Sequence, residues 1–334
     1  MPTNVSPEYF KAEERYQQAK TIEEKILATQ ELIRVAPKHK GTEKLLKTLK
    51  RRLAKLREEL QKQQSRRVGG GPSFAVKKEG AAQVALVGVP NSGKSMLLRW
   101  LTGARSEVAD YPFTTQRPVP GMMQFEDIQI QLVEVPALIK GSSTGKGLGA
   151  QSLGVARNAD AIALVIDVST DPIAQVKTLL GEFEAAGILL NQVDKVDDTP
   201  DKNYVQRQAT IIATKGDFRG ARERFEKLRR TFGDRFPMVL VSAEKGSDQD
   251  ELKRLIFENL KIIRVYTKRP DKKSSERPLV LPNGSTVLDV AKVVHKDLVR
   301  DLKFARVWGS TRFPGQQVPR DYALQDKDTV ELHA

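Results

Sequence analysis

The sequence predicts an α/β protein with a mainly parallel sheet, preceded by an α-helical hairpin and followed by a small domain of strands and one helix. Three observations indicate this arrangement. Short apolar strands alternate with helical stretches through the middle of the chain, and leucines recur at heptad spacing before them. A glycine-rich joint and a second change of pattern mark the borders between the parts. The 334 residues are enough for two or three domains, each with its own core.

Composition excludes several classes of protein and site. Hydrophobic residues make up 39% and charged residues 29%, as in ordinary globular proteins. The absence of cysteine excludes disulfides, thiolate-bound metals and a cysteine nucleophile, and the three histidines lie far apart. The sequence has neither a run of about 18 apolar residues nor an apolar signal core, so we expect a cytoplasmic protein with no membrane partner.

The net charge of +14 is concentrated at the two ends of the chain. Residues 1–78 carry a net charge of +10, residues 79–261 of −1 and residues 262–334 of +5. Basic ends favour a polyanionic partner such as nucleic acid, because cations that contact phosphates release counterions. The alternative is that a lysine-rich hairpin serves solubility alone.

Residues 1–67 are predicted to form a basic helical hairpin, with helices over residues 7–35 and 39–65. The second helix carries leucines spaced 3, 4, 3 and 4 residues apart, which the hairpin itself is expected to bury. Residues 68–80 contain three successive glycines and are predicted to form a linker. The leucines of this seam are Leu46, Leu49, Leu53, Leu56 and Leu60.

Residues 81–261 are predicted to form the α/β domain, with a polar loop or shortened insertion at residues 192–208. Residues 262–334 are predicted to form the small domain. Its helix begins at Ser285 or Thr286, and Pro282–Gly284 forms a turn between two strands. The predicted strands are 83–87, 128–134, 161–167, 210–213, 238–241, 262–267, 279–281, 305–308 and 329–332. The predicted helices of these two domains are 95–102, 150–158, 172–186, 218–232, 248–260 and 285–298.

Residues 88–95, GVPNSGKS, match the phosphate-binding P-loop pattern between a strand and a helix. Backbone N–H groups of such a loop surround phosphate oxygens, and the helix N-terminus adds a partial positive charge. Lys94 can reach the outer phosphates, and Ser95 can bind Mg²⁺. The alternative, a simple glycine-rich turn, leaves the adjacent Lys-Ser pair unexplained. The predicted phosphate-side contacts are Pro90, Asn91, Ser92, Gly93, Lys94, Ser95 and Met96.

Recognition of guanine needs a carboxylate that accepts from the base, and two segments compete for this role. Asn191–Asp194 keeps the Asn and Asp of an N-K-x-D pattern but lacks its lysine, whereas Thr214–Asp217 keeps the Lys and Asp. The second segment follows a predicted strand, so Asp217 is favoured, with Lys215 beside the base and bracing the P-loop. The alternative for Asp217 is a solvent-facing turn residue. The predicted base-side contacts are Thr214, Lys215, Asp217, Ser242, Ala243 and Glu244.

Residues 106–120 and 134–150 are the two candidate switch segments. Thr115 lies in a polar loop from which it could reach Mg²⁺ and the γ-phosphate, and Glu134 ends a predicted strand where P-loop proteins place a carboxylate near the metal. Glycines at 141, 145, 147 and 149 allow the second segment to order and disorder. Ser95, Thr115 and Glu134 are therefore the predicted Mg²⁺ ligands.

These residues resemble the Obg class of GTPases, specifically the developmentally regulated GTP-binding proteins, over about residues 40–334. The resemblance includes the hairpin before the P-loop, YPFTT at 111–115, the glycine-rich residues 139–160 and the guanine segment. VYTK at 265–268, LVLP at 279–282 and VWG at 307–309 resemble the TGS domain, a ubiquitin-like β-grasp. The resemblance implies a P-loop GTPase domain that binds GTP, GDP and Mg²⁺, contact with the ribosome or structured RNA, and a small stabilising protein partner. It also implies that Asn191 borders a shortened insertion and does not read the base.

Several residues depart from the pattern of that family or of related enzymes. Glu134 and Ala137 replace the Asp and Gly of D-x-P-G, and Thr214 replaces the guanine-motif Asn. Leu138 stands where Ras-like enzymes have the glutamine that orients water. In related GTPases a P-loop asparagine helps to bind K⁺, so Asn91 is a candidate K⁺ ligand, and the alternative is that it only stabilises the loop. The predicted catalytic set is Lys94, Thr115, Ala137 and Leu138.

The sequence therefore predicts a GTP-binding switch with slow Mg²⁺-dependent hydrolysis that acts on the ribosome or structured RNA. Two alternatives stay open. The changes at Glu134 and Ala137 allow a GTP-binding scaffold that no longer hydrolyses, and Thr214 allows a P-loop ATPase with relaxed base choice.

Overall fold

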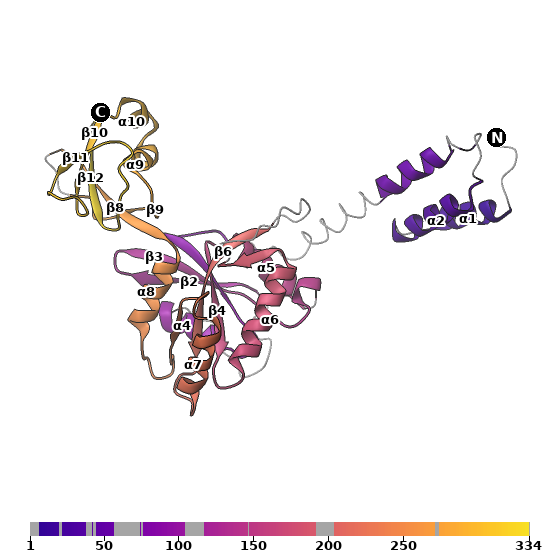
Figure 1. Cartoon of the computed structure of the whole chain (residues 1–334), viewed down its shortest axis with the longest axis horizontal. Coiled ribbons are helices and arrows are strands. Elements are labelled where there is room, and N and C mark those ends of the chain that lie inside the picture. Colours follow the sequence, from indigo (N-terminus) through magenta and orange to yellow (C-terminus); the bar gives the residue numbers. More distant parts are fainter. Residues whose placement is uncertain are drawn as a thin grey trace. The chain divides into compact units, whose positions relative to one another are not determined.

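The computed structural model describes residues 7–19, 22–37, 42, 45–56, 74, 76–103, 117–145, 147–191, 204–270 and 274–333 (Figure 1). The chain divides into two compact units, Met1–Ser73 and Phe74–Ala334, and their border falls within the predicted linker of residues 68–80. No helix in these described ranges is long and apolar enough to cross a membrane.

In its described residues, the first unit has three α-helical segments where the sequence predicted two. α1 (Pro7–Gln18) and α2 (Ile22–Val35) divide the predicted first helix, and a further helical segment covers residues 45–56. The T-x-x-E pattern at residues 21–24 favours a new helix start there, although the heptad and stripe patterns alone predict one helix. The three segments share a small core, so Leu49 of the leucine seam is used in internal packing. This core consists of Tyr9, Ala12, Leu32, Ala36 and Leu49.

The second unit begins with a seven-stranded sheet in which the strands run in the order β2-β3-β1-β4-β6-β5, with β7 also paired to β6. All pairs are parallel except β2 with β3, so the predicted mainly parallel sheet is confirmed. The strands are β1 (Ala82–Val87), β2 (Val119–Phe125), β3 (Ile128–Glu134), β4 (Ala161–Asp167), β5 (Ile188–Leu190), β6 (Val205–Thr214) and β7 (Met238–Leu240).

Helices cover both faces of this sheet, as the sequence predicted. Successive residues of β1 point to opposite faces, so that Ala85 and Val87 join one core cluster and Val84 and Leu86 the other. The first cluster packs under α5 (Gly149–Asn158), α6 (Pro172–Ala185) and α7 (Ala221–Phe232). The second packs under α4 (Lys94–Thr102) and α8 (Gln249–Asn259).

Two strands of the α/β domain were not predicted, and one prediction was partly wrong. β2 contains a proline and a glycine, and β5 has only three residues, so neither produces a clear strand pattern. The interval 192–208 was predicted to be a loop, but β6 begins at Val205, where it pairs with Ile188 of β5. Residues 192–203 lie outside the described residues.

The C-terminal part of the second unit is a five-stranded sheet in the order β11-β10-β12-β8-β9, packed on one side by helices. Its parallel pair, β8 with β12, lies between antiparallel neighbours. The elements are β8 (Ile262–Lys268), β9 (Leu279–Pro282), α9 (Val287–Val294), α10 (Lys296–Asp301), β10 (Phe304–Trp308), β11 (Gln316–Val318) and β12 (Asp328–His333).

Three local predictions in this part need correction. The turn after Pro282 leads into α9, not into a strand, and the predicted single helix is interrupted at His295. The short strand β11 was missed. Thr286 proves to be the cap of α9, because its side chain and that of Asp289 form a reciprocal capping box.

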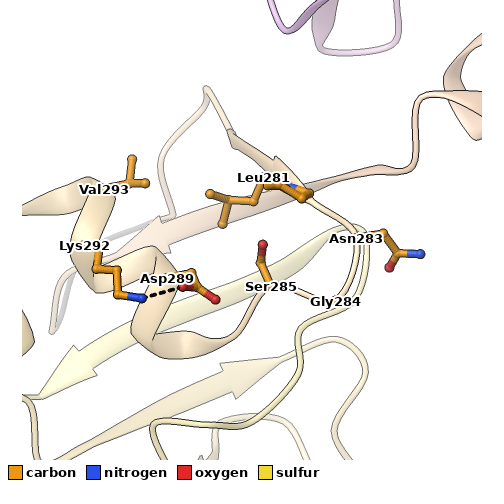
Figure 2. Close-up of a pocket in the computed structure, with 8 residues that line it drawn as sticks. Leu281, Asn283, Gly284, Ser285, Asp289, Lys292 and Val293 are labelled. Carbon is orange, nitrogen blue, oxygen red and sulfur yellow. Dashed lines mark hydrogen bonds and ion pairs between the residues drawn. The ribbon is translucent and has the colours of Figure 1, made fainter. Parts of the chain in front are cut away.

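A hollow of about 380 Å³ lies between the end of β9 and α9 (Figure 2). Asp289 and Lys292 form an ion pair of 2.9 Å at its edge. The backbone N–H of Thr286, followed by Lys292, lowers the pKa of Asp289 to about 2. The charged groups at this hollow are thus already satisfied within the helix.

Candidate nucleotide-binding site

The P-loop joins β1 to α4 through a turn that needs glycine at two positions. A Cβ on Gly88 would lie 2.4 Å from the carbonyl oxygen of Val165, and Gly93 has a φ of 87° in the left-handed region. α4 then begins at Lys94. Its first N–H groups have no intrahelical partners and carry a partial positive charge, so this strand–turn–helix arrangement suits phosphate.

Lys94 is buried, and its ammonium group is held by the loop itself. Nζ donates to the carbonyl oxygens of Val89 at 2.9 Å and Gly88 at 3.2 Å. Burial lowers the pKa of Lys94 to about 8, although the neighbouring Glu134 carboxylate works in the opposite direction. Phosphate groups would supply the strong anionic partner that this buried cation favours.

Ser95 and Glu134 form a pair of oxygen ligands beside Lys94. Ser95 Oγ donates to Glu134 Oε1 at 2.5 Å, and Glu134 is 1% exposed at the end of β3. A hydroxyl and a carboxylate are donors that fit Mg²⁺, which uses hard oxygen ligands. The structure therefore brings two of the three predicted Mg²⁺ ligands together. Thr115, with the rest of residues 104–116, lies outside the described residues.

Thr214 ties the base-side segment to the P-loop. It ends β6, is 5% exposed and donates from Oγ1 to the carbonyl oxygen of Ser92 at 2.7 Å. Lys215 was predicted to brace the P-loop, and its neighbour Thr214 makes this contact. Lys215 instead pairs with Asp167 at the end of β4, with Nζ 2.6 Å from Oδ2.

Asp217 contacts the segment that follows β7. Ser242 Oγ donates to Asp217 Oδ1 at 2.7 Å, and the same hydroxyl accepts from the Lys245 N–H at 3.2 Å. The Ser242 hydroxyl is the main cause that holds the pKa of Asp217 below its ordinary value. The carboxylate is therefore ionised at neutral pH and able to accept hydrogen bonds from a purine N–H.

Asn191, the competing candidate, has a structural role. Its side-chain N–H groups donate to the carbonyl oxygens of Ala209 at 2.7 Å and Arg235 at 3.0 Å, and its Oδ1 accepts from the Ala209 N–H. These bonds join the end of β5 to the neighbouring strand. Residues 192–194 lie outside the described residues.

The second switch segment packs directly against the P-loop. The Leu138 N–H donates to the Gly88 carbonyl oxygen at 3.1 Å, and the Leu138 side chain is buried in the core cluster with Val87 and Leu153. The Leu138 side chain therefore serves packing, and the catalytic role predicted for this position stays a prediction. Ala137, immediately before it, is half-buried.

Glu182 of α6 holds the next turn of this segment, the short helix η2 (Ser142–Thr144). Its carboxylate accepts from the N–H groups of Gly141 and Ser143, each at 2.7 Å. Burial acts to raise the pKa of Glu182, but these N–H bonds lower it overall. Sequence reasoning missed Glu182, because a glutamate within a helix carries no special signal. It also missed Asp167, although that residue ends a predicted strand.

The remaining predicted contacts lie at the rim of the site. Pro90 is half-buried, and Asn91 is exposed with a φ of 59°. Met96 is 44% exposed. Ala243 and Glu244 occupy the turn after Ser242. The K⁺-binding role of Asn91 stays a prediction.

Two family models match the chain, a 50S ribosome-binding GTPase over residues 83–195 and a TGS domain over residues 263–334. Similar solved structures include a variant of Aquifex aeolicus Era bound to GDP.AlF4⁻, which is 20% identical, covers 68% of this chain and 71% of that chain, and has a TM-score of 0.41. S. thermophilus NFeoB bound to GDP.AlF4⁻ and K⁺ is 22% identical over 53% of this chain and 60% of that chain, with a TM-score of 0.39.

Relatives match almost the whole chain. An uncharacterised GTP-binding protein of Methanocaldococcus jannaschii is 34% identical over 93% of this chain and 92% of its own length. Developmentally-regulated GTP-binding protein 1 of Xenopus laevis is 33% identical over 88% of this chain and 94% of its own. With its P-loop GTPase and TGS domains, the chain therefore belongs to the family of developmentally regulated GTP-binding proteins.

Proposed function

We propose that this protein binds GTP and GDP, hydrolyses GTP slowly with Mg²⁺, and acts as a cytoplasmic switch on the ribosome or structured RNA. The observation that carries the nucleotide part is the joining of the phosphate-side and base-side segments. Thr214 links β6 to the P-loop at Ser92. Asp217, which follows β6, accepts a hydrogen bond from Ser242, which follows β7. A phosphate cradle and an ionised carboxylate thus lie on connected loops at the carboxyl ends of parallel strands, where such sheets bind ligands.

The chain's own residues suggest how the reaction would proceed. Lys94 and the loop N–H groups would neutralise charge on the phosphates, and Ser95 and Glu134 would hold Mg²⁺, which would supply further positive charge there. Catalysis would consist mainly of positioning and electrostatic stabilisation. Leu138 is apolar and buried, so no side chain at that position orients the attacking water. Slow intrinsic turnover follows from this absence.

Competition between GTP, ATP and XTP tests the base assignment. Asp217→Asn should move preference from GTP towards XTP, because an amide presents a donor where xanthine presents a carbonyl oxygen. Asp234→Asn, the same carboxylate-to-amide change in the exposed turn after α7 and outside the predicted contacts, is the matched control and should leave preference unchanged. Wild-type protein that binds ATP as well as GTP would support the ATPase alternative instead.

Single-turnover hydrolysis tests the switch against the scaffold alternative. Hydrolysis that occurs with Mg²⁺, and faster with ribosomes present, supports the switch, whereas no hydrolysis under either condition supports a scaffold. Replacement of K⁺ by Na⁺ tests Asn91 in the same assay. Turnover that does not change on this replacement would remove K⁺ from the proposal.

The RNA part of the proposal is supported by the basic ends of the chain and by the family description, 50S ribosome-binding GTPase. Cosedimentation with ribosomes in the presence of a GTP analogue, GDP or no nucleotide tests it. A switch should sediment most with the GTP analogue. Equal sedimentation in all three conditions, or none, would contradict it. The small stabilising protein partner stays a prediction from the family resemblance.

A further inference from the structure

The first unit contains a hollow of about 550 Å³, and the charged side chains that line it are all basic among the described residues. The helical segment of residues 45–56 contributes Thr48, Arg51, Arg52 and Lys55, which are spaced so that they share one face of the helix. α1 contributes Tyr16, and α2 contributes Lys25. Four cations from two helical segments therefore surround one concave surface, and none of the described residues that line it is a carboxylate.

These cations are not neutralised within the described part of the first unit. None of the four forms an ion pair there, whereas Arg15, on the same unit, pairs with Glu31 at 3.0 Å. Arg51, Arg52 and Lys55 are exposed, and Lys25 is half-buried. Gathering like charges around a hollow is unfavourable by itself, so the arrangement indicates an anionic ligand that relieves the repulsion.

The geometry of Arg52 favours nucleic acid among polyanions. Its guanidinium lies over the Tyr16 ring, 5.0 Å from the ring centroid. A stacked guanidinium and ring form a planar surface of the kind on which nucleic-acid bases stack. Arg51 adds a second planar fork, and such forks bind phosphate oxygens through paired hydrogen bonds.

We infer that this hollow binds a single-stranded segment of RNA, such as the loops and ends that structured RNA presents, with Arg51, Lys25 and Lys55 on phosphates and the Arg52–Tyr16 stack beside a base. This inference deepens the RNA part of the proposed function and rests on it. It assigns that contact to one concave surface of the first unit, in place of a diffuse positive charge.

The test uses the full-length chain and a fluorescent single-stranded RNA of about 20 nucleotides with mixed sequence. Arg51→Gln/Lys55→Gln removes two charges from the hollow. Lys47→Gln/Lys50→Gln removes two charges from exposed positions of the same helical segment that do not line it. The first pair should weaken binding about tenfold near 0.1 M salt and reduce the slope of log K against log salt by about 1.4. The control pair should change binding less than threefold.

Tyr16→Leu provides an independent arm. It should weaken RNA binding while leaving the salt slope unchanged, because it removes stacking and no charge. Thermal melts of every variant and their affinity for GDP should match the wild type, which shows that the variants are folded and that the nucleotide site is intact.

Four results would overturn the inference. These are equal weakening by the two glutamine pairs, no effect of either pair, stronger competition by poly-glutamate than by unlabelled RNA, and no binding of the RNA by wild-type protein. These results do not decide the proposed function, which ribosome cosedimentation tests separately. If wild-type protein still cosediments with ribosomes in a GTP-dependent way, only the assignment to the hollow is lost.

Discussion

Lys94 shows how a single buried cation prepares the site for an anion. Among the described residues, neutral groups of the P-loop bind its amine, and Glu134 lies near it, so burial dominates and its pKa falls to about 8. The folded protein therefore carries a destabilising charge below pH 8, and that cost is relieved as pH rises from about 8 towards the ordinary lysine value. Bound phosphates would favour the charged amine and raise the pKa of Lys94 again.

Nucleotide affinity should consequently depend on pH through Lys94. Below about pH 8 the amine is charged with and without ligand, so affinity should be flat, and above it affinity should fall by up to about tenfold per pH unit. Calorimetry in buffers of different ionisation enthalpy should show proton uptake on binding near pH 8.5. Lys94→Arg, whose guanidinium stays charged, should show no uptake. Binding that releases protons in the wild type would contradict this account.

Thr214 should matter through its hydroxyl more than through its shape. Thr214→Val keeps the volume but leaves the Ser92 carbonyl oxygen without its donor, which should cost about 1–2 kcal/mol of stability. Nucleotide affinity should fall with it, because the P-loop loses its tie to β6. Denaturant unfolding and GDP titration measure the two effects. Thr214→Ser keeps the hydroxyl and should retain most of both, and a Val variant as tight-binding as the Ser variant would refute the role.

Individual site residues were predictable where a motif fixes both identity and spacing. The phosphate-side residues and the pairing of the 214–217 and 242–244 segments follow from the P-loop pattern and from strand ends. The contact of Thr214 with the P-loop and the pairing of Lys215 with Asp167 did not follow from the sequence. Asp167 comes from a strand far away in sequence, and only the parallel pairing of β4 with β6 brings its carboxylate to Lys215.

At the level of elements, η2 depends on a side chain from another helix. Glu182 satisfies two N–H donors of the second switch segment, at Gly141 and Ser143. Glu182→Ala should leave both without this acceptor and lower the free energy of unfolding by about 1.5–3 kcal/mol. Hydrogen exchange should accelerate at Gly141 and Ser143 more than in β4. Glu184→Ala, on the exposed side of the same helix, is the matched control. Unchanged exchange at these two amides would refute the role of Glu182.

The elements that the sequence predicted are those with a long apolar run or strong helical periodicity. β3 and β4 match their predicted bounds, because each is a continuous apolar or alternating run of seven residues. β2 and β5 depend on neighbours instead. The proline and glycine of β2 are tolerated at the sheet's edge, and the three residues of β5 form a strand only by pairing with β6.

At the scale of the second unit, Arg264 of β8 joins the TGS domain to the GTPase domain. It is 2% exposed and binds Asp326 of its own domain through two nitrogen–oxygen contacts of 2.6 and 3.0 Å. The same guanidinium binds Glu126 at 2.6 Å and Asp127 at 2.8 Å in the turn between β2 and β3. These carboxylates strongly raise the pKa of Arg264, so it stays charged at any working pH.

Aromatic side chains complete this junction. The Arg264 guanidinium lies 4.9 Å from the ring centroid of Phe257 in α8, and Phe257 stacks on Phe125 of β2. Tyr266 of β8 donates to Asp127. Arg264 and Tyr266 contact the β2–β3 turn, and β3 leads from this turn to Glu134 in the candidate Mg²⁺ site. One hairpin therefore contacts both the TGS domain and the nucleotide site.

Removal of Arg264 should therefore allow the GTPase and TGS domains to unfold independently. Arg264→Ala leaves the carboxylates of Glu126, Asp127 and Asp326 without their shared cation, which should lower the free energy of unfolding by about 3 kcal/mol, the lower end for buried pairs because these carboxylates are partly exposed. Calorimetry should then resolve two unfolding transitions where the wild type shows one. Arg306→Ala, at an exposed position of β10 in the same sheet, should change stability by about 0.5 kcal/mol or less.

Acid should act like the mutation. The pKa values of Glu126 and Asp127 are lowered in the folded state, so their contribution to stability is lost once pH falls through those values. A single transition at the wild-type temperature in Arg264→Ala would show that Arg264 does not couple the two domains.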